Sequence, residues 1–267
     1  ILYGTLLLSD KSDVILEKEI KREKYNLNCV SNYLVSKNFD KPKTDIDKQK
    51  TLAFNSAKEN LVNIFNVHNH FYSITLPTGL GKTITSLAVA NEIKKKINQK
   101  NLRIIITIPF TSIIDQNFEV YKQIVNSDNS SILLKHHHLA EIKYKNNEEI
   151  FDYDKSEFLI ETWQSEIIVT TFVQLLESLF QINKTKVMKI PNITNSIIIM
   201  DEIQTIDYKY WELLNTTFKV ISNLYNCYFI LMTATQPLIF EPDKEIKEII
   251  PNYKHYFKTF NRTKIIN

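Results

Sequence analysis

Glycine, cysteine and arginine are all scarce in this chain of 267 residues, which has three glycines, two cysteines and three arginines. The cysteines, Cys29 and Cys227, show neither CxxC spacing nor a histidine at zinc-ligand distance. This pattern excludes a disulfide framework and indicates reduced thiols, as in cytoplasmic proteins.

Long apolar runs are also missing. The longest, such as residues 104–108 and 197–200, fall far short of the roughly 18 residues that a membrane span needs. The chain starts at Ile1 and lacks the basic start and small-residue cleavage site of a signal peptide. We therefore expect a cytoplasmic protein that does not bind a membrane. We also expect the chain to be a piece of the product of a longer reading frame.

Charge of either sign shows no excess, because 33 basic and 30 acidic residues give a formal net charge of +3. Bulk charge therefore does not identify the partner. Any binding of nucleic acid has to come from a local surface.

Short runs of β-branched and aromatic residues alternate with stretches of helical periodicity from residue 71 onwards. Runs that are apolar on both faces are typical of central strands in a parallel sheet covered by helices. The expected strands are 71–76, 103–108, 166–170, 196–200 and 226–232, and the expected helices are 81–96, 112–125, 172–182 and 208–224. The sequence therefore predicts an α/β domain whose ligands bind at the carboxyl ends of the strands.

The chain divides into three parts on the same evidence. Residues 1–50 are expected to form a helical extension and a polar linker, which could be the tail of an upstream domain. Residues 51–240 form the main domain and open with a helix at 51–66, and residues 241–267 begin a connector. The stretch 127–164 has a strand-like start, a charged middle and a helix near 156–163.

Two of the three glycines lie in the segment "LPTGLGKT", between an expected strand and an expected helix. With Thr78, Gly79 and Gly81 in the turn, backbone N–H groups can surround a phosphate at the start of the helix. Lys82 would reach the β- and γ-phosphates of a nucleotide, and the Thr83 hydroxyl would hold Mg²⁺. The strict phosphate-loop pattern G-x-x-x-x-G-K-[ST] is missed at its first position, where the chain has leucine.

Two further strand ends carry polar groups suited to a nucleotide hydrolase. The strand "SIIIM" ends in Asp201, which would orient Mg²⁺, and Glu202, which would accept the proton of an attacking water. The last expected strand is followed by "TAT", which contains Thr233 and Thr235. Their hydroxyls can hydrogen-bond the acidic motif and respond to loss of the γ-phosphate.

The motifs "LPTGLGKT", "DEIQ" and "TAT" resemble motifs I, II and III of superfamily 2 helicases. Together with "TIPFTSIIDQN", the histidines of "LLKHHHLAE" and "VTTFVQLLESLF", they are similar to the helicase part of the CRISPR-associated helicase-nuclease of type I systems. The resemblance covers about residues 74–237 and implies a single first RecA-like lobe that uses ATP and Mg²⁺. It also implies a catalytic role for Gln204, in addition to Lys82, Asp201 and Glu202.

The same resemblance implies the partners. They are single-stranded DNA, a second helicase lobe and an upstream HD nuclease in the parent chain, and a CRISPR surveillance complex. DNA would touch Thr111 and Ser112 at one helix start, and Thr170 and Thr171 at the next. Asp10 would occupy the place of a nuclease metal ligand, but without an upstream His-Asp pair it is interpreted as a surface carboxylate.

Three other features are given ordinary interpretations. His136 to His138 are expected in a solvated or DNA-facing loop, because adjacent histidines on a strand cannot all face one ion. Lys94 to Lys96, which end a helix, are expected to form a solvated face. Trp163 and Trp211 are expected in the core.

Several alternatives stay open at this point. A nucleoside-phosphate kinase would need a lid rich in arginine, which Arg22, Arg103 and Arg262 do not provide. The others are a different P-loop ATPase such as a restriction-type translocase, and a non-catalytic nucleotide-binding fragment. The lack of an arginine in a motif context predicts a site that a second lobe completes with an arginine finger.

Overall fold

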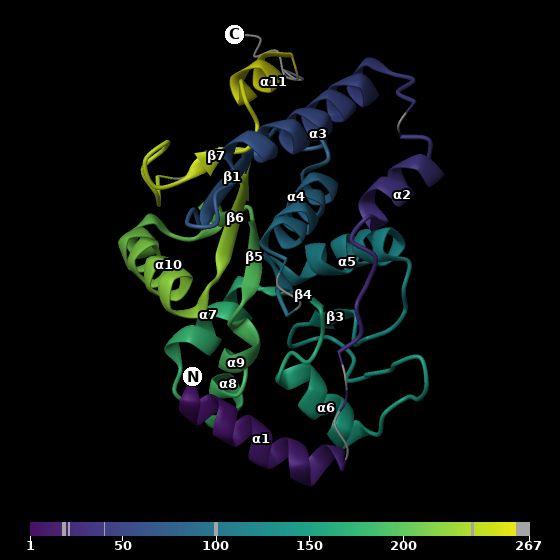
Figure 1. Cartoon of the computed structure of the whole chain (residues 1–267), viewed down its shortest axis with the longest axis vertical. Coiled ribbons are helices and arrows are strands. Elements are labelled where there is room, and N and C mark those ends of the chain that lie inside the picture. Colours follow the sequence, from purple (N-terminus) through teal and green to yellow (C-terminus); the bar gives the residue numbers. More distant parts are fainter. Residues whose placement is uncertain (18–19, 21, 40, 99–100, 236–237, 260–267) are drawn as a thin grey trace.

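The computed structural model describes residues 1–17, 20, 22–39, 41–98, 101–235 and 238–259. Its centre is a seven-stranded sheet with the order β3-β4-β2-β5-β6-β1-β7, in which every neighbouring pair is parallel (Figure 1). The strands are β1 Phe71–Thr75, β2 Arg103–Ile108, β3 Leu133–His136, β4 Ile167–Thr171, β5 Ser196–Asp201, β6 Tyr228–Thr233 and β7 Lys247–Glu248. The predicted parallel α/β sheet is confirmed.

Helices connect the strands and add an N-terminal extension. The α-helices are α1 Leu2–Leu16, α2 Cys29–Ser36, α3 Asp45–Ile64, α4 Lys82–Ile97, α5 Thr111–Val125, α6 Tyr153–Glu161, α7 Phe172–Phe180, α8 Lys184–Val187, α9 Ile190–Ile193, α10 Trp211–Tyr225 and α11 Tyr253–Thr259. Two 3₁₀ helices, η1 Ile203–Thr205 and η2 Tyr208–Tyr210, precede α10. None of the helices in the described ranges is long and apolar enough to cross a membrane.

Each face of the sheet has its own hydrophobic core, which explains why the central strands are predominantly apolar on both faces. In β2, Ile104 and Ile106 lie in the core beneath α3, α4 and α5, whereas Ile105 lies in the core beneath α6, α7 and α10. Alternate side chains of a strand point to opposite faces, so a strand covered on both sides needs no polar position. Figure 1 shows α10 on one side of the sheet and α4 and α5 on the other.

The N-terminal part is more structured than the sequence indicates. Helix α3 starts at Asp45 and not at residue 51, because Thr44 and Asp47 form a capping box in which the Thr44 side chain accepts the Asp47 N–H at 3.1 Å. Helix α2 occupies part of the expected linker and buries Cys29 and Val30 in the core. The polar linker expected up to residue 50 therefore contains α2 and the first residues of α3.

The C-terminal part also belongs to the packed unit. Strand β7 pairs with β1, and Ile249 and Ile250 are fully buried in the same core as α3 and α4. A boundary at residue 240 therefore does not coincide with the edge of this domain. The stretch 127–164 contains β3 and α6, and Trp163 is fully buried, as expected.

A buried ion cluster fixes the extension to the domain. Glu166, just before β4, is 1% exposed and pairs with Arg22 through its Nε at 2.8 Å and with Lys94. Lys94 is thus buried against a carboxylate, which corrects the expectation of a solvated lysine face, whereas Lys95 and Lys96 are exposed. The segment after α1 is tied electrostatically to the amino-terminal edge of the sheet.

Candidate functional site

The tips of β5, β6 and β1 form the candidate site. These strands are adjacent and parallel, so their carboxyl ends meet at one edge of the sheet. Two backbone bonds align the tips, because Glu202 N donates to Met232 O at 2.9 Å and Leu76 N donates to Thr233 O at 3.2 Å. The predicted convergence of three strand ends is confirmed as geometry.

The loop from residue 76 to residue 81 links β1 to α4 and has the conformation that its glycines predict. Gly79 and Gly81 have φ values of 87° and 80°, in the left-handed region that glycine adopts at little cost. A Cβ atom at Gly81 would meet no atom within 4 Å, so the backbone conformation and not crowding favours glycine there. Thr78 and Gly79 are exposed, and buried Leu80 anchors the loop in the core.

Lys82, the first residue of α4, contacts the acidic motif directly. Its Nζ lies 2.7 Å from Glu202 Oε1, and the lysine side chain is 9% exposed. The amine of the phosphate loop and the carboxylate of the acidic motif therefore occupy one small volume at the sheet edge. A lysine at this place can bind phosphate oxygens, provided that it exchanges its carboxylate partner for them.

Asp201 is the group whose environment is most unusual. Burial and the adjacent Glu202 raise the pKa of Asp201 to about 6, although Lys82 opposes the shift. The Asp201 Oδ1 atom is buried and has no hydrogen-bond partner within the described ranges. A carboxylate oxygen left without a partner fits a ligand of Mg²⁺, which prefers carboxylate, hydroxyl and phosphate oxygens. The half-buried Thr83, the second residue of α4, would supply such a hydroxyl.

Glu202 itself is held in a left-handed backbone conformation with a φ of 51°. Residues other than glycine adopt this conformation rarely, and it turns the chain sharply from β5 into η1. The turn brings Gln204 back onto the carboxylate, so that Gln204 Nε2 donates to Glu202 Oε2.

The third strand end joins the same network. Thr233 Oγ1 donates to Gln204 Oε1 at 2.7 Å, and Thr235 N donates to Thr233 Oγ1 at 2.9 Å. A chain of hydrogen bonds thus runs from the tip of β6 through Gln204 to Glu202 and Lys82. Thr235 is exposed, and the following two residues of the "TATQP" segment lie outside the described residues.

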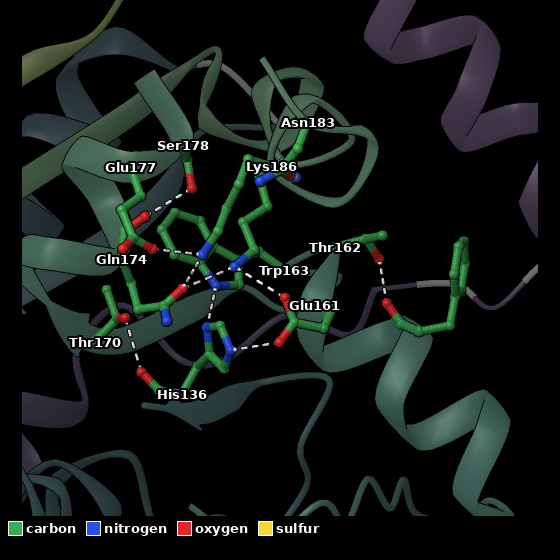
Figure 2. Close-up of polar contacts among 12 residues, drawn as sticks. His136, Glu161, Thr162, Trp163, Thr170, Gln174, Glu177, Ser178, Asn183 and Lys186 are labelled. Carbon is green, nitrogen blue, oxygen red and sulfur yellow. Dashed lines mark hydrogen bonds and ion pairs between the residues drawn. The ribbon is translucent and has the colours of Figure 1, made fainter. Parts of the chain in front are cut away.

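The residues expected to touch nucleic acid fall into two groups. Thr111 and Ser112 lie in the first turn of α5, where N–H groups lack helical partners; Thr111 is half-buried and Ser112 is exposed. Thr171 is also buried, and its side chain caps α7 by accepting the Gln174 N–H at 3.1 Å. Thr170 is fully buried and donates to His136 O at 2.8 Å (Figure 2), so its hydroxyl is not available to a phosphate in this structure.

The segment His136 to His138 differs from the expected solvated or DNA-facing loop. His136 and His137 are buried, so they do not form a solvated loop, and His138 alone is exposed. Trp163 Nε1 donates to His136 Nδ1 at 2.8 Å, which leaves Nε2 to donate to Glu161 at 3.1 Å (Figure 2). Burial lowers the pKa of His136, in keeping with a neutral ring.

A buried lysine completes this network, which sequence reasoning missed. Lys189 is fully buried, lies 3.2 Å from Glu161 Oε2, and donates to Gln174 Oε1 at 3.1 Å. Burial lowers the pKa of Lys189 to about 8. No local pattern announces this lysine, because its partners come from α6 and α7 and meet only in the folded chain.

Comparisons with known proteins identify the family and the fold of the chain. The family described as "Type III restriction enzyme, res subunit" matches residues 43–238. A protein of Haloferax volcanii named "CRISPR-associated nuclease/helicase Cas3" is 32% identical over 200 residues, which are 70% of this chain. The chain spans about a fifth, 21%, of the length of that relative.

Solved structures show the same fold at lower identity. The crystal structure of T. fusca Cas3 with AMPPNP superposes with a TM-score of 0.60 and 15% identity, over 93% of this chain and 26% of that one. The helicase MrfA bound to DNA gives a TM-score of 0.53 and 15% identity, over 88% of this chain and 31% of that one. The predicted RecA-like fold is confirmed. The chain belongs to the family of type III restriction enzyme res subunits and carries a helicase-type lobe like that of Cas3.

Proposed function

We propose that the chain is the ATP-binding motor lobe of a superfamily 2 DNA helicase or translocase. The observation that carries the proposal is the contact between Lys82 and Glu202, which joins the phosphate loop to the acidic motif at 2.7 Å. A kinase or a simple binding domain needs no water-activating carboxylate beside the phosphate-loop lysine, whereas an ATP hydrolase does.

The residues take separate roles in this proposal. Thr78, Gly79 and Gly81 offer backbone groups to the phosphates, and Lys82 neutralises the β- and γ-phosphates. Asp201 and the Thr83 hydroxyl would hold Mg²⁺, which supplies charge neutralisation between the phosphates when it is bound.

Glu202 is the proposed general base. Its Oε1 atom contacts Lys82, and movement of Lys82 to a phosphate would free this carboxylate oxygen to accept a proton from water. Gln204 keeps the other oxygen oriented through its hydrogen bond. Thr233 and Thr235 pass the state of this cluster to the tip of β6, from which a change after γ-phosphate loss would spread.

The arginines of the chain support completion by a second lobe. Arg22 is paired with Glu166, and Arg103 donates to Asn192 far from the strand tips at the start of β2. Arg262 lies outside the described residues. Since an arginine finger contributes on the order of 10³-fold or more to such reactions, the lobe alone is expected to bind ATP with little turnover.

Single-stranded DNA is the proposed track. Its phosphates would approach the first turns of α5 and α7, at Thr111, Ser112 and Thr171, because helix N-termini attract anions. Thr170 would contribute by fixing the end of β4 and not by direct contact.

The Cas3-like relative favours a role in CRISPR type I interference in the cytoplasm, with an upstream HD nuclease, a second lobe and a surveillance complex as partners. The match to residues 43–238 by a restriction-enzyme family supports a second candidate, a restriction-type translocase. The two differ in the protein that recruits the motor and not in the chemistry of the lobe. Recruitment by a guide-RNA complex in a binding assay separates them.

The test is ATP hydrolysis by the longer protein that carries this lobe. We expect turnover only with single-stranded DNA, loss of turnover in Lys82→Ala, and in Glu202→Gln a loss of turnover with retained ATP binding. DNA-independent hydrolysis that survives Lys82→Ala would contradict the proposal.

A further inference from the structure

Glu248, on the short strand β7, has a carboxylate surrounded by four hydrogen-bond donors. Its Oε2 accepts from Ser73 Oγ at 2.9 Å and from Thr75 Oγ1 at 2.6 Å. Its Oε1 accepts from Thr75 N at 3.2 Å and from Ile250 N at 2.8 Å. These partners are neutral, and burial raises the pKa of Glu248 although its hydrogen bonds oppose the shift.

The length of β7 explains why the side chain is needed. The ladder pairs Tyr72 with Lys247 and Ser73 with Glu248, and Ile249 N closes it with a bond of 2.8 Å to Ser73 O. The next amide of β1 on this edge belongs to Thr75, two residues further along, where β7 has already ended. An unpaired buried amide is costly, and the Glu248 carboxylate takes the place of the missing strand.

The backbone around Glu248 is itself anchored. Asn60 Nδ2, from α3, donates to Glu248 O at 3.3 Å and to Ile249 O at 3.0 Å. Ile249 and Ile250 are fully buried beside α3 and α4. The carboxylate is therefore held by the core and not by a mobile surface segment.

Thr75, which the Glu248 carboxylate holds in place and which we call the clamped residue, directly precedes the phosphate loop. Thr75 is the last residue of β1, Leu76 follows with its N–H bonded to Thr233 O, and Gly79 and Gly81 come next. One edge of the β1 tip is thus fixed by β6, and the other edge is fixed by Glu248. Residue 248 lies beyond the matched residues 43–238, so the family comparison does not cover this contact.

We propose that Glu248 is a positioning residue for the phosphate loop, acting on bound ATP through Thr75. The inference rests on the proposed function as far as ATP is concerned. It makes the segment after β6 part of the nucleotide site, because any movement of β7 pulls on the strand that leads into the loop. Glu248 touches no nucleotide in this role.

Hydrogen-bonding capacity, and not charge, is what the clamp requires. Glutamine at 248 can accept the two backbone amides with its oxygen and donate its amide group to the oxygens of Ser73 and Thr75. Alanine removes every acceptor. The pair of variants Glu248→Ala and Glu248→Gln therefore separates loss of the clamp from loss of a charge.

The experiment measures the Kd of a fluorescent ATP analogue with Mg²⁺ in the folded protein, together with amide exchange without nucleotide. We expect Glu248→Ala to weaken binding about fivefold to tenfold, the effect of one or two lost hydrogen bonds, and Glu248→Gln to stay within about twofold. The matched control is Glu245→Ala, on the same segment, which removes contacts with Lys219 and Asn215 but none with β1. It is expected to leave Kd unchanged.

Amide exchange keeps the test independent of the proposed function. If the wild-type protein binds ATP no better than Lys82→Ala, the proposed function fails, and the clamp is still judged by exchange at residues 78–82. Glu248→Ala should speed exchange there about fivefold or more and leave α10 unchanged. Should Glu248→Ala not fold, Thr75→Val removes a single donor and should weaken ATP binding about twofold to fivefold. Folded variants with wild-type Kd and wild-type exchange in the loop would overturn the proposal.

Discussion

The substitution Glu166→Gln removes the anion that pairs with Lys94 and Arg22 in the buried ion cluster. Glu166 is 1% exposed, and its partners Lys94 and Arg22 have exposed fractions of 8% and 13%. Burial lowers the pKa of the nearby Arg103 to about 9, with a further lowering from Arg22, and Glu166 opposes the shift. Without it, buried cations face one another with no compensating charge.

The expected loss of stability is large and asymmetric. Breaking a buried ion pair by removing one partner costs about 3–5 kcal/mol, a sizeable part of the roughly 5–15 kcal/mol that stabilises a typical domain. Lys94→Met removes one cation and leaves Arg22 and Glu166 as a balanced pair. Because Arg22 still compensates the buried Glu166 carboxylate, no buried charge is left alone, and we expect the cost of Lys94→Met to stay within about 1 kcal/mol.

Urea denaturation at neutral pH, followed by circular dichroism, gives both free energies of unfolding. The exposed pair Lys244 and Glu241 provides the control, and Glu241→Gln should leave the midpoint unchanged. Equal losses in Glu166→Gln and Lys94→Met would refute the reasoning. Such a result would mean that packing, and not charge balance, holds the N-terminal segment against the sheet.

Three further predictions concern the candidate site and its surroundings. Asp201→Asn should abolish the Mg²⁺ dependence of ATP binding. It should also raise the free energy of unfolding by about 1–2 kcal/mol in urea titrations at neutral pH. The reason is that burial and Glu202 disfavour the charged carboxylate and raise the pKa of Asp201 to about 6. Burial lowers the pKa of His136, so on acidification the unfolded chain takes up a proton at a higher pH than the folded chain does. The stability that is present above about pH 6.5 is therefore lost as the pH falls through that value. The accompanying drop in melting temperature should be smaller in His136→Gln. Thr111→Val combined with Ser112→Ala should weaken binding of labelled single-stranded DNA about threefold to tenfold without changing ATP affinity, and an unchanged DNA affinity would remove α5 from the proposed track.

The sheet and the phosphate loop could be predicted because their signals are local. Residues 104–106 are apolar without interruption, which is typical of a strand covered on both faces, and glycine at 79 and 81 marks the turn into α4. The parallel topology then brings Lys82 and Glu202 to the same edge. The fold and the contact between Lys82 and Glu202 followed from these few positions.

The features that were missed depend on contacts between distant segments. Lys94 ends a lysine-rich helix and shows no local sign of pairing with Glu166, 72 residues away. In the sequence His136 is typical of a polar loop, and its burial depends on contacts with Trp163 and α6, which lie more than 15 residues further along the chain. Strand β7 is two residues long, too short for any periodicity to show. The start of α3 was readable, since Thr44 and Asp47 have the spacing of a capping box.

The central claim is that three strand tips meet around one nucleotide, with Lys82 reaching both the phosphates and the acids. The most direct measurement is titration of the protein with a fluorescent ATP analogue and Mg²⁺, comparing the wild type with Lys82→Ala and with Lys96→Ala, an exposed lysine of the same helix. The account predicts saturable binding that Lys82→Ala weakens at least about tenfold, the effect of a charge-assisted contact to phosphate, and that Lys96→Ala leaves unchanged. Equal affinity in all three proteins would contradict it.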